Sequence, residues 1–477
     1  MTSAIYSAGM AERAPANRVT VDRQQLEAMI RADEIDTVIM AFPDLQGRLA
    51  GKRTTGRFFL DSVADAGTEN CDYLIACDLD YEPVDGYTFA SYEQGYGDML
   101  ASADWDTIRV LPWMEKTALI MCDLFDVTTN ELIPVAPRSI LRAQAEAAAS
   151  AGFLPMVASE IEFFLFRETY EEAHAKGYRD LTPHSPWLED YNILQTSKDE
   201  YIIGQIRRNL ERAGVPVEFS KGEAGRGQHE MNLEYTTAIE MADRNSVYKN
   251  GAKEMASING RSISFMAKYD IGETGSSCHI HSSLWSLDGE TALFDGHSEP
   301  DAEAHHGMSA LFRHYLAGLI ATSREFALLW APTINSYKRF QPGSWAPTGI
   351  GWGVDNRTLG YRLVGHGKGT RVECRVPGSD ANSYLAFAGV LAGGLYGIRH
   401  ELPLGDPFVG NGYTAPDIPR IPSTIVEAIH LWEHSEIARE CFGDDVHHHI
   451  LTMAKGEWAA FNHAVTDWEL RRYWERI

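Results

Sequence analysis

Two glutamates on one face of a predicted strand are the first indication of chemistry in this sequence. Glu160 and Glu162 lie two positions apart in the otherwise apolar segment 158–166. Alternate residues of a strand point to the same side, so both carboxylates would face the same way. Burial of an unpaired carboxylate is unfavourable, and we therefore expect these side chains to bind a cation.

Three further segments supply ionisable side chains, and two of them repeat the spacing of two. They supply Glu223 and Glu230 (residues 222–230), His279 and His281 (277–282), and Arg371, Glu373 and Arg375 (370–376). Taken alone, a Glu-x-Glu or His-x-His pair is more often an exposed edge or a packing contact. Four such segments together favour metal binding. Carboxylates with one imidazole suit Mg²⁺ or Mn²⁺, and so many ligands fit two neighbouring ions, an arrangement suited to phosphoryl transfer.

Arginines gather later in the chain, at positions 339, 357, 362, 371 and 375. A guanidinium group binds a carboxylate or a phosphate through two parallel hydrogen bonds. In so acidic a protein, this concentration of arginines indicates an anionic substrate, although surface ion pairing would also account for it.

The composition excludes several classes of partner. The 477 residues carry a formal net charge of -25, which repels nucleic acid and anionic membrane surfaces. Six scattered cysteines without a Cys-x-x-Cys pair indicate a reducing compartment. The first 17 residues lack the pattern of a signal peptide, and no stretch has the length and apolar character of a membrane span. We therefore expect a cytoplasmic protein.

Length and residue patterning predict an α+β chain of two domains. Residues 1–19 should be frayed. Residues 20–132 form a small strand-rich domain, with a helix at 21–31 capped by Thr20 and strands at 36–42, 48–53 and 118–125. Prolines near residue 133 mark the boundary. Residues 133–477 form the larger domain, with helices expected at 137–150, 199–213, 238–258, 303–329, 382–399, 423–440 and 451–474.

In their order, these motifs resemble the glutamine synthetase superfamily in its bacterial type I form. The resemblance covers the chain from roughly residue 20 to the end. It rests on Glu-Ile-Glu-Phe-Phe-Leu-Phe, Gly-Gln-His-Glu, His-Ile-His-Ser, Asn-Ser-Tyr-Lys-Arg-Phe-x-Pro-Gly and Arg-Val-Glu-Cys-Arg-Val-Pro. The resemblance implies an N-terminal β-grasp domain and a C-terminal catalytic domain with a curved antiparallel sheet flanked by helices. It also implies a dodecamer of two hexameric rings, with active sites between neighbouring subunits.

The resemblance also implies a role for each motif residue. One metal would be held by Glu162, Glu223 and Glu230, and a second, beside the ATP phosphates, by Glu160, His279 and Glu373. Arg339 and Arg375 would bind the carboxylate of L-glutamate or the developing acyl phosphate, and Gly275 would line the glutamate site. Arg357 and Arg362 would neutralise the transferring phosphoryl group, while His281, Ser283 and Arg371 would contact the nucleotide. ATP would phosphorylate the γ-carboxylate of L-glutamate, and an amine would then displace phosphate.

Departures from the ammonia-using members bear on the amine. We find no Asp-Gly-Ser-Ser segment, and the comparable residues 67–73 offer no assignable aspartate. Where those members place Tyr-Glu, this sequence has Ser344 and Trp345, and Thr274 replaces an asparagine. Ammonium needs an anionic cage, whereas an organic amine brings carbon that an indole can bury. The sequence therefore favours the γ-glutamylamine ligase branch.

The residues leave more than one acceptor and more than one function open. A monoamine such as ethanolamine is favoured, because no row of carboxylates for a polyamine can be located. An aromatic amine would also explain the missing base. The motifs are compatible, too, with an ordinary ammonia-using glutamine synthetase and with an inactive structural or regulatory homologue.

Three further signals are discounted. Residues 365–370 resemble a phosphate loop but lack its spacing, so a hairpin turn is predicted. Three consecutive histidines, residues 447–449, cannot share one helix face, so we expect no metal there. Tyr413 lies near a position that is adenylylated in some relatives, but the surrounding residues differ, and we predict no such regulation.

Overall fold

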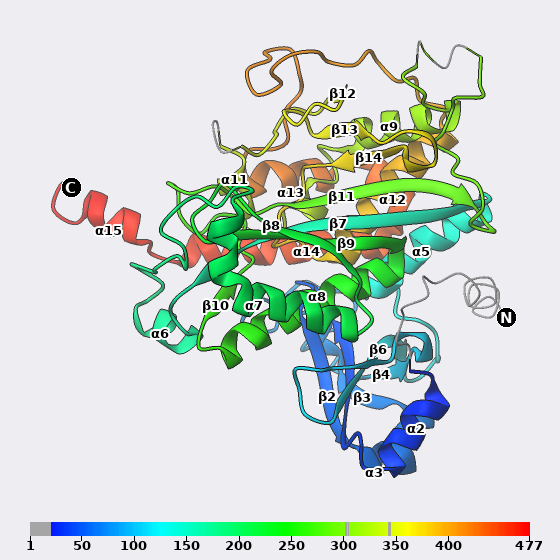
Figure 1. Ribbon diagram of the computed structural model, residues 1–477, viewed down its shortest axis with the longest axis vertical. Helices are drawn as coiled ribbons and strands as arrows, with labels where there is room; N and C mark the ends of the chain where they lie inside the picture. Colours follow the sequence, from blue (N-terminus) through cyan, green and yellow to red (C-terminus); the bar gives the residue numbers. More distant parts are fainter. Residues whose placement is uncertain (1–20, 301–302, 304, 342–344) are drawn as a thin grey trace.

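Two β-sheets organise the computed structural model, which describes residues 21–300, 303, 305–341 and 345–477 (Figure 1). Within these residues the strands form one sheet of six and one of eight. The smaller sheet lies at one end of the molecule, below the helices that pack on the larger sheet (Figure 1). The expected frayed segment 1–19 and the expected cap Thr20 lie outside the described residues.

The smaller sheet has the order β2-β1-β6-β4-β3, with β5 paired to β6. Strands β1 and β6 are parallel, and the other neighbours are antiparallel. The strands are β1 (Thr37–Pro43), β2 (Leu49–Thr55), β3 (Thr68–Cys71), β4 (Asp98–Ala103), β5 (Arg109–Val110) and β6 (Thr117–Asp126). The strands predicted at 36–42, 48–53 and 118–125 are β1, β2 and β6.

The larger sheet has the order β12-β13-β14-β11-β7-β9-β8, with β10 paired to β7. Its neighbours are antiparallel except β12 and β13, which are parallel and correct the expectation of a wholly antiparallel sheet. The strands are β7 (Phe153–Phe166), β8 (Val217–Gly222), β9 (Gln228–Thr237), β10 (Ser262–Ser264), β11 (Cys278–Ser286), β12 (Trp352–Val354), β13 (Tyr361–Val364) and β14 (Arg371–Cys374).

Helices cover the larger sheet. Helix α12 packs against α5, α8 and α9, and α5 also packs against α8. The longer helices are α2 (Arg23–Arg31), α5 (Pro137–Ser150), α7 (Ile193–Arg212), α8 (Ala238–Ile258), α9 (Ala310–Thr322), α12 (Ser383–Arg399), α13 (Ile425–Glu433), α14 (Glu436–His463) and α15 (Asp467–Tyr473). Shorter ones are α3 (Gly56–Phe58), α4 (Ala64–Ala66), α6 (Tyr170–Ala175), α10 (Ala327–Trp330) and α11 (Ser336–Arg339). The predictions at 137–150 and 238–258 are confirmed to the residue.

Hydroxyl groups explain two helix predictions that were wrong. The helix expected at 303–329 is two helices, because the hydroxyls of Thr322 and Ser323 donate to carbonyls one turn back and end α9. The helix expected at 423–440 breaks before Ser435, whose hydroxyl accepts from the Ala438 backbone and starts α14. Helix α14 then runs through the gap between the two predicted C-terminal helices, with a kink at Gly443 (φ 78°).

The first described helix, α2, begins in a capping box. The Asp22 carboxylate accepts from the Gln25 backbone at 2.8 Å, and the Gln25 side chain accepts from the Asp22 backbone at 2.9 Å. Asp22 therefore replaces Thr20 as the cap.

Arg138, in the first turn of α5, joins the smaller sheet to α8, one of the helices that pack on the larger sheet. Its buried guanidinium donates to Asp243 of α8 at 3.2 and 3.0 Å and to Asp104 at 2.6 Å, and it also pairs with Asp123 of β6. Buried ion pairs of this kind need well-matched geometry, because each charge has lost its hydration. This junction is therefore electrostatic as well as apolar.

No helix among the described residues is long and apolar enough to cross a bilayer.

A buried histidine ties α14 to the N-terminal part of the chain. His449 is 1% exposed, and its Nε2 bonds to the carbonyl of Ile75 at 2.8 Å. Burial lowers the pKa of His449 to about 4, although the bond to Ile75 opposes the shift. The native imidazole therefore stays neutral at pH values at which a solvent-exposed histidine would begin to take up a proton.

His449 should make the protein sensitive to acid. Unfolding returns its pKa to 6.5, so below that value the unfolded chain binds more protons than the native one, and stability falls as the pH is lowered toward about 4. We expect this residue to contribute about 2 kcal/mol of destabilisation by about pH 5. Thermal melts should show a smaller drop in Tm from about pH 7 to about pH 5 for His449→Gln, which keeps a donor but does not titrate. Equal drops in variant and parent would contradict this.

Candidate functional site

Strand register brings the predicted ligands to one face of the larger sheet. Glu160 of β7 is opposite His279 of β11, and Glu162 is opposite Glu230 of β9. Glu373 of β14 is opposite His281 of β11. The shared face that the spacing of β7 predicts is therefore present. We use the name carboxylate cage for Glu160, Glu162, Glu223, Glu230, His279 and Glu373.

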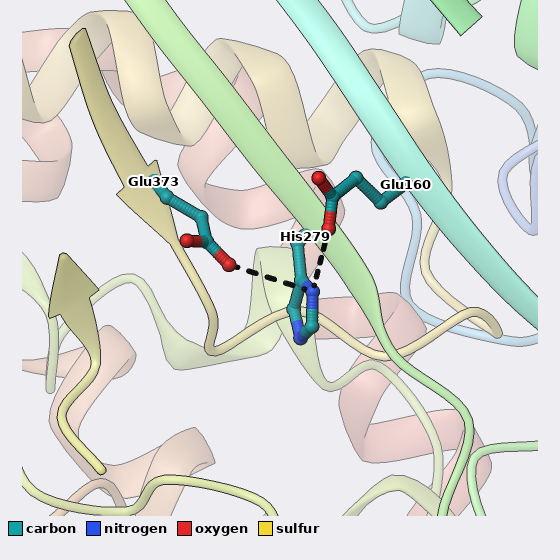
Figure 2. A group of neighbouring side chains, drawn as sticks. All are labelled: Glu160, His279 and Glu373. Atoms are coloured by element: carbon teal, nitrogen blue, oxygen red, sulfur yellow. Dashed lines mark hydrogen bonds and ion pairs between the residues drawn. The ribbon is translucent and has the colours of Figure 1, made fainter. Parts of the chain in front are cut away.

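His279 lies at the centre of the carboxylate cage. Figure 2 shows its ring between Glu160 and Glu373, with Nδ1 at 3.2 Å from Glu160 Oε2 and 3.6 Å from Glu373 Oε1. The ligand atoms of these three residues lie within 4.8 Å of one another, and the same holds for Glu162, Glu230 and His279. The sequence placed His279 with only one of these groups, whereas it lies within reach of both.

Glu223 joins the carboxylate cage through a lysine. Lys221 of β8 is opposite Glu230 in register, its ammonium pairs with Glu223, and it lies 3.9 Å from Glu230 Oε1. Lys221 was not predicted from the sequence, although it lies two positions before Glu223, which was. An ammonium between two cage carboxylates indicates a site that attracts positive charge.

Burial and repulsion set the charge of the cage. Burial raises the pKa of Glu162 to about 7, with a further rise from Glu223. Burial likewise raises the pKa of Glu230 well above its ordinary value, helped by Glu160 and Glu223. A divalent ion would favour the ionised form of both carboxyls and so lower both pKa values.

The opposite side of the cage is ionised. Burial opposes charge on Glu160, but hydrogen bonds with His279 and His281 outweigh it and lower the pKa. Burial also opposes charge on Glu373, yet the Arg375 guanidinium holds its pKa at about 2. Carboxylate donors with one imidazole, some charged and some able to lose a proton, fit Mg²⁺ or Mn²⁺.

Neighbouring polar groups fix the orientation of Glu162. The backbone N–H and the hydroxyl of Ser277 each donate to it at 2.8 Å, and Gln228 Nε2 donates at 3.1 Å. Gln228 also donates to the Gly275 carbonyl at 2.9 Å. Neither Ser277 nor Gln228 was predicted as a partner, because only the fold reveals which backbone passes Glu162.

Arg339 and Arg375 form a buried pair beside the cage. Arg339, on α11, is 2% exposed and donates to the carbonyls of Val376 and Arg375 at 2.7 and 3.1 Å. Gly275 permits this packing, because a Cβ there would lie 2.7 Å from Arg339 Cγ. Arg375 pairs with Glu373, and its buried Nε has no hydrogen-bond partner among the described residues. Such an orphaned donor is suited to an anionic ligand.

The other two predicted phosphoryl arginines are placed differently. Arg362 of β13 donates to Glu373 at 2.9 Å and to Asp355 at 2.9 Å, so it belongs to the cage wall. Arg357 is exposed on the turn between β12 and β13. The structure therefore brings Arg362 to the carboxylates and leaves Arg357 at the surface.

The predicted nucleotide residues share one face. His281 Nε2 lies 2.9 Å from Glu160 Oε1, and Arg371 Nε donates to His281 Nδ1 at 3.1 Å. Ser283, two positions further along β11, accepts from the Trp285 indole at 3.1 Å. These contacts form a polar row that leads away from the cage.

Trp345 has an unpredicted partner in Tyr413. The residues before it, 342–344, lie outside the described residues. Trp345 has a positive φ of 63° and a side chain that is 73% exposed, so it does not form a closed wall in this single chain. The Tyr413 hydroxyl donates to the Trp345 carbonyl at 2.8 Å. Burial raises the pKa of Tyr413, whereas the nearby charges of Arg375 and Arg339 lower it.

The discounted motifs have structural roles. Residues 367–369 form a short helical turn between β13 and β14, as the predicted hairpin requires. The rings of residues 447–449 bond to the carbonyls of Trp432, Gly86 and Ile75, at three separate places. No shared metal site joins these three described histidines.

This chain is similar to proteins of one family. The family profile described as glutamine synthetase, catalytic domain, matches residues 134–473. Gamma-glutamylethanolamide synthetase GlnA4 of Streptomyces coelicolor is 49% identical over 95% of this chain and 96% of its own length. Glutamate--isopropylamine ligase of a Pseudomonas species is 35% identical over 94% and 97%. The solved structure of apo GmaS without ligand has a TM-score of 0.81 at 26% identity, and the match covers 94% of this chain and 99% of that chain.

Replacing Glu230 by glutamine should change metal affinity and stability in opposite directions. We expect Glu230→Gln to weaken Mn²⁺ binding, followed by electron paramagnetic resonance, by more than about 100-fold, beyond the loss typical of outer-shell changes. In a chelating buffer at neutral pH the same variant should have a higher Tm than the parent, because the buried carboxyl must take up a proton on folding and a neutral amide need not.

The matched control is Glu146→Gln, an exposed acid on α5. It should leave both quantities unchanged. A lower Tm for Glu230→Gln in chelator, or unchanged Mn²⁺ affinity, would show that Glu230 is an ordinary structural acid.

Proposed function

We propose that this chain, which belongs to the glutamine synthetase family, is an ATP-dependent ligase that joins the γ-carboxylate of L-glutamate to an organic amine. The observation that carries the proposal is the carboxylate cage beside buried Arg375, whose Nε has no partner among the described residues. A cluster that binds cations next to a vacant guanidinium donor is suited to phosphoryl transfer onto a carboxylate. The names of two relatives specify products made from glutamate and an amine.

In the proposed site, the six residues of the carboxylate cage hold two Mg²⁺ or Mn²⁺ ions. When bound, the ions spread the negative charge of the ATP phosphates. A bound ion would favour the ionised form of Glu162 and Glu230, and Lys221 would have to move aside from Glu223 and Glu230. The polar row of His281, Ser283 and Arg371 contacts the nucleotide.

Arginines orient the acyl group in the proposed reaction. Arg375 offers its unpaired Nε to the substrate carboxylate, and Arg339 positions Arg375 by binding its carbonyl. Arg362, held against Glu373, neutralises charge on the phosphoryl group as it moves to the γ-carboxylate. Arg357 contacts the phosphoryl group only if its exposed turn, between β12 and β13, moves toward the cage. The amine then attacks the γ-glutamyl phosphate and releases phosphate.

The acceptor side of the site favours an organic amine over ammonium. Trp345 brings apolar surface, and Tyr413 carries no charge at neutral pH, because burial raises its pKa from an already high value. The acid that ammonia-using members place at position 345 is absent from the sequence. We propose ethanolamine or a similar small monoamine as the acceptor, supported by the 49% identical relative.

We propose that the larger-scale organisation also follows the family. Residues 20–132 would be a β-grasp domain and residues 133–477 the catalytic domain. Twelve subunits would form two hexameric rings, which would bring a neighbouring chain against exposed Trp345 and complete the amine site.

An amine panel tests the proposed reaction. With L-glutamate and Mg·ATP, phosphate release should depend on an organic amine, be highest with ethanolamine or isopropylamine, and stay low with ammonium. Mass spectrometry should detect the corresponding γ-glutamyl amide. Strong turnover with ammonium alone would point instead to an ordinary glutamine synthetase. ATP hydrolysis that no amine or glutamate stimulates would favour an inactive homologue.

The bond between Tyr413 and Trp345 gives a second test. Tyr413→Phe removes a hydrogen bond worth about 1 kcal/mol, so the KM for the amine should rise about 5-fold while that for ATP stays unchanged. The matched control is Tyr178→Phe, which alters an exposed tyrosine on the turn after α6. A rise in both KM values, or in neither, would remove Tyr413 from the amine site.

A further inference from the structure

A second group of metal-ligand residues lies behind the carboxylate cage. We use the name rear cluster for Glu189, Asp199 and His229. They come from the loop before α7, from α7 and from β9. His229 precedes Glu230 on β9, so the two side chains point to opposite faces of the sheet. The rear cluster therefore lies in a separate place from the carboxylate cage.

The three side chains of the rear cluster converge. His229 Nε2 lies 3.0 Å from Asp199 Oδ2 and 3.5 Å from Glu189 Oε2. One ligand atom from each residue falls within 4.8 Å of the other two. None of the three is more than 1% exposed. These are the distances expected for donors around one ion, since bonds of about 2.1 Å at tetrahedral angles separate donors by roughly 3.4 Å.

The environment of the Glu189 carboxylate indicates that a ligand binds in the rear cluster. Both of its carboxylate oxygens are buried and lack a hydrogen bond of ordinary geometry among the described residues, although Ser185 and Asp199 lie close enough to influence its charge. Buried carboxylates are nearly always paired or bound to a metal, because loss of hydration without compensation is costly. The side chain is directed at His229 and Asp199, where a cation would complete its coordination.

We propose that the rear cluster binds one divalent transition-metal ion, with Zn²⁺ as the best match and Mn²⁺ as the nearest competitor. Two carboxylates would balance the charge of such an ion. An imidazole among the donors favours these metals over Mg²⁺ or Ca²⁺, which prefer oxygen alone. Three protein ligands leave room for a water as the fourth.

An outer shell already orients one ligand. His184 Nδ1 lies 2.6 Å from Asp199 Oδ1, and its Nε2 lies 3.1 Å from the Tyr201 hydroxyl. Asp199 thus uses one oxygen for His184 and turns the other toward His229. Metal-binding carboxylates usually have such partners, which hold the ligand in place before the ion arrives.

The rear cluster also supports the carboxylate cage from behind. The loop that carries Glu189 donates from the Asp190 backbone to the Glu223 carbonyl at 3.0 Å and from Tyr191 to the Gly222 carbonyl at 3.3 Å. Gly222 allows the close approach, because a Cβ there would lie 2.4 Å from Glu189 Cβ. An ion in the rear cluster would fix this loop and, through it, the backbone of Glu223.

The competing explanation is a shared proton. Burial raises the pKa of Glu189, and the nearby Asp199 charge raises it further. A protonated Glu189 would need no metal. The two explanations differ in whether purified protein retains a metal that depends on Glu189 and Asp199.

Metal content separates these explanations. The full-length protein is stripped with chelator, reloaded with Zn²⁺ alone, and desalted into buffer with excess Mg²⁺ before mass spectrometry of the metals. We expect about one zinc per subunit in the parent and in His279→Ala, which disables the cage, but at least a 10-fold loss in Glu189→Gln and Asp199→Asn. With Mg²⁺ kept in excess so that the carboxylate cage stays filled, a zinc-selective chelator should also lower the Tm of the parent and leave that of Glu189→Gln unchanged.

A direct observation covers the case in which the variants do not fold. Anomalous scattering at the zinc edge from crystals of the reloaded parent should give a peak between Glu189, Asp199 and His229. Three outcomes would each overturn the proposal in favour of a shared proton. They are loss of zinc in His279→Ala, an anomalous peak only in the carboxylate cage, and no retained zinc at all.

Discussion

The structure depends on holding several carboxylates together against their mutual repulsion. Glu162 and Glu230 face each other across β7 and β9, and burial raises the pKa of both. Such a cluster would push its strands apart unless the surrounding residues compensated. Lys221 supplies positive charge at one end of the cluster, and two arginines flank Glu373 at the other. The carboxylates of the central strands thus have too few positive partners among the surrounding residues. Affinity for cations follows from this imbalance.

Much of the site could be predicted from the sequence, because side-chain direction in a strand has a period of two. That rule placed Glu160 and Glu162 on one face and did the same for His279 and His281. It could not reveal which strands are neighbours, and so it missed Ser277 and Gln228 beside Glu162. The family resemblance, for its part, assigned His279 to one metal group only. Residue patterning also found the long helices, but it missed the hydroxyl contacts that end α9 and start α14.

Within one chain, the residues proposed for phosphoryl transfer are more firmly held than those proposed to bind the amine. The phosphoryl side is rigid, since Arg339, Arg362 and Arg375 all have partners that fix their planes. The acceptor side is open, with Trp345 exposed and the Tyr413 hydroxyl bonded to the Trp345 carbonyl. In the proposed function, the sheet carries the phosphoryl-transfer residues, and the loops that carry Trp345 and Tyr413 would select among amines.

Gly222 allows the close packing of the rear cluster against the strand that leads to Glu223. It has no side chain, it touches Glu189 on one face of β8, and it directly precedes Glu223. Any larger residue would have to displace the Glu189 loop or the strand itself. Random mutagenesis that selects for inactive proteins should therefore recover changes at this glycine as readily as changes at the ligands. Such alleles would resemble ligand mutants in every assay while retaining all of the ionisable groups.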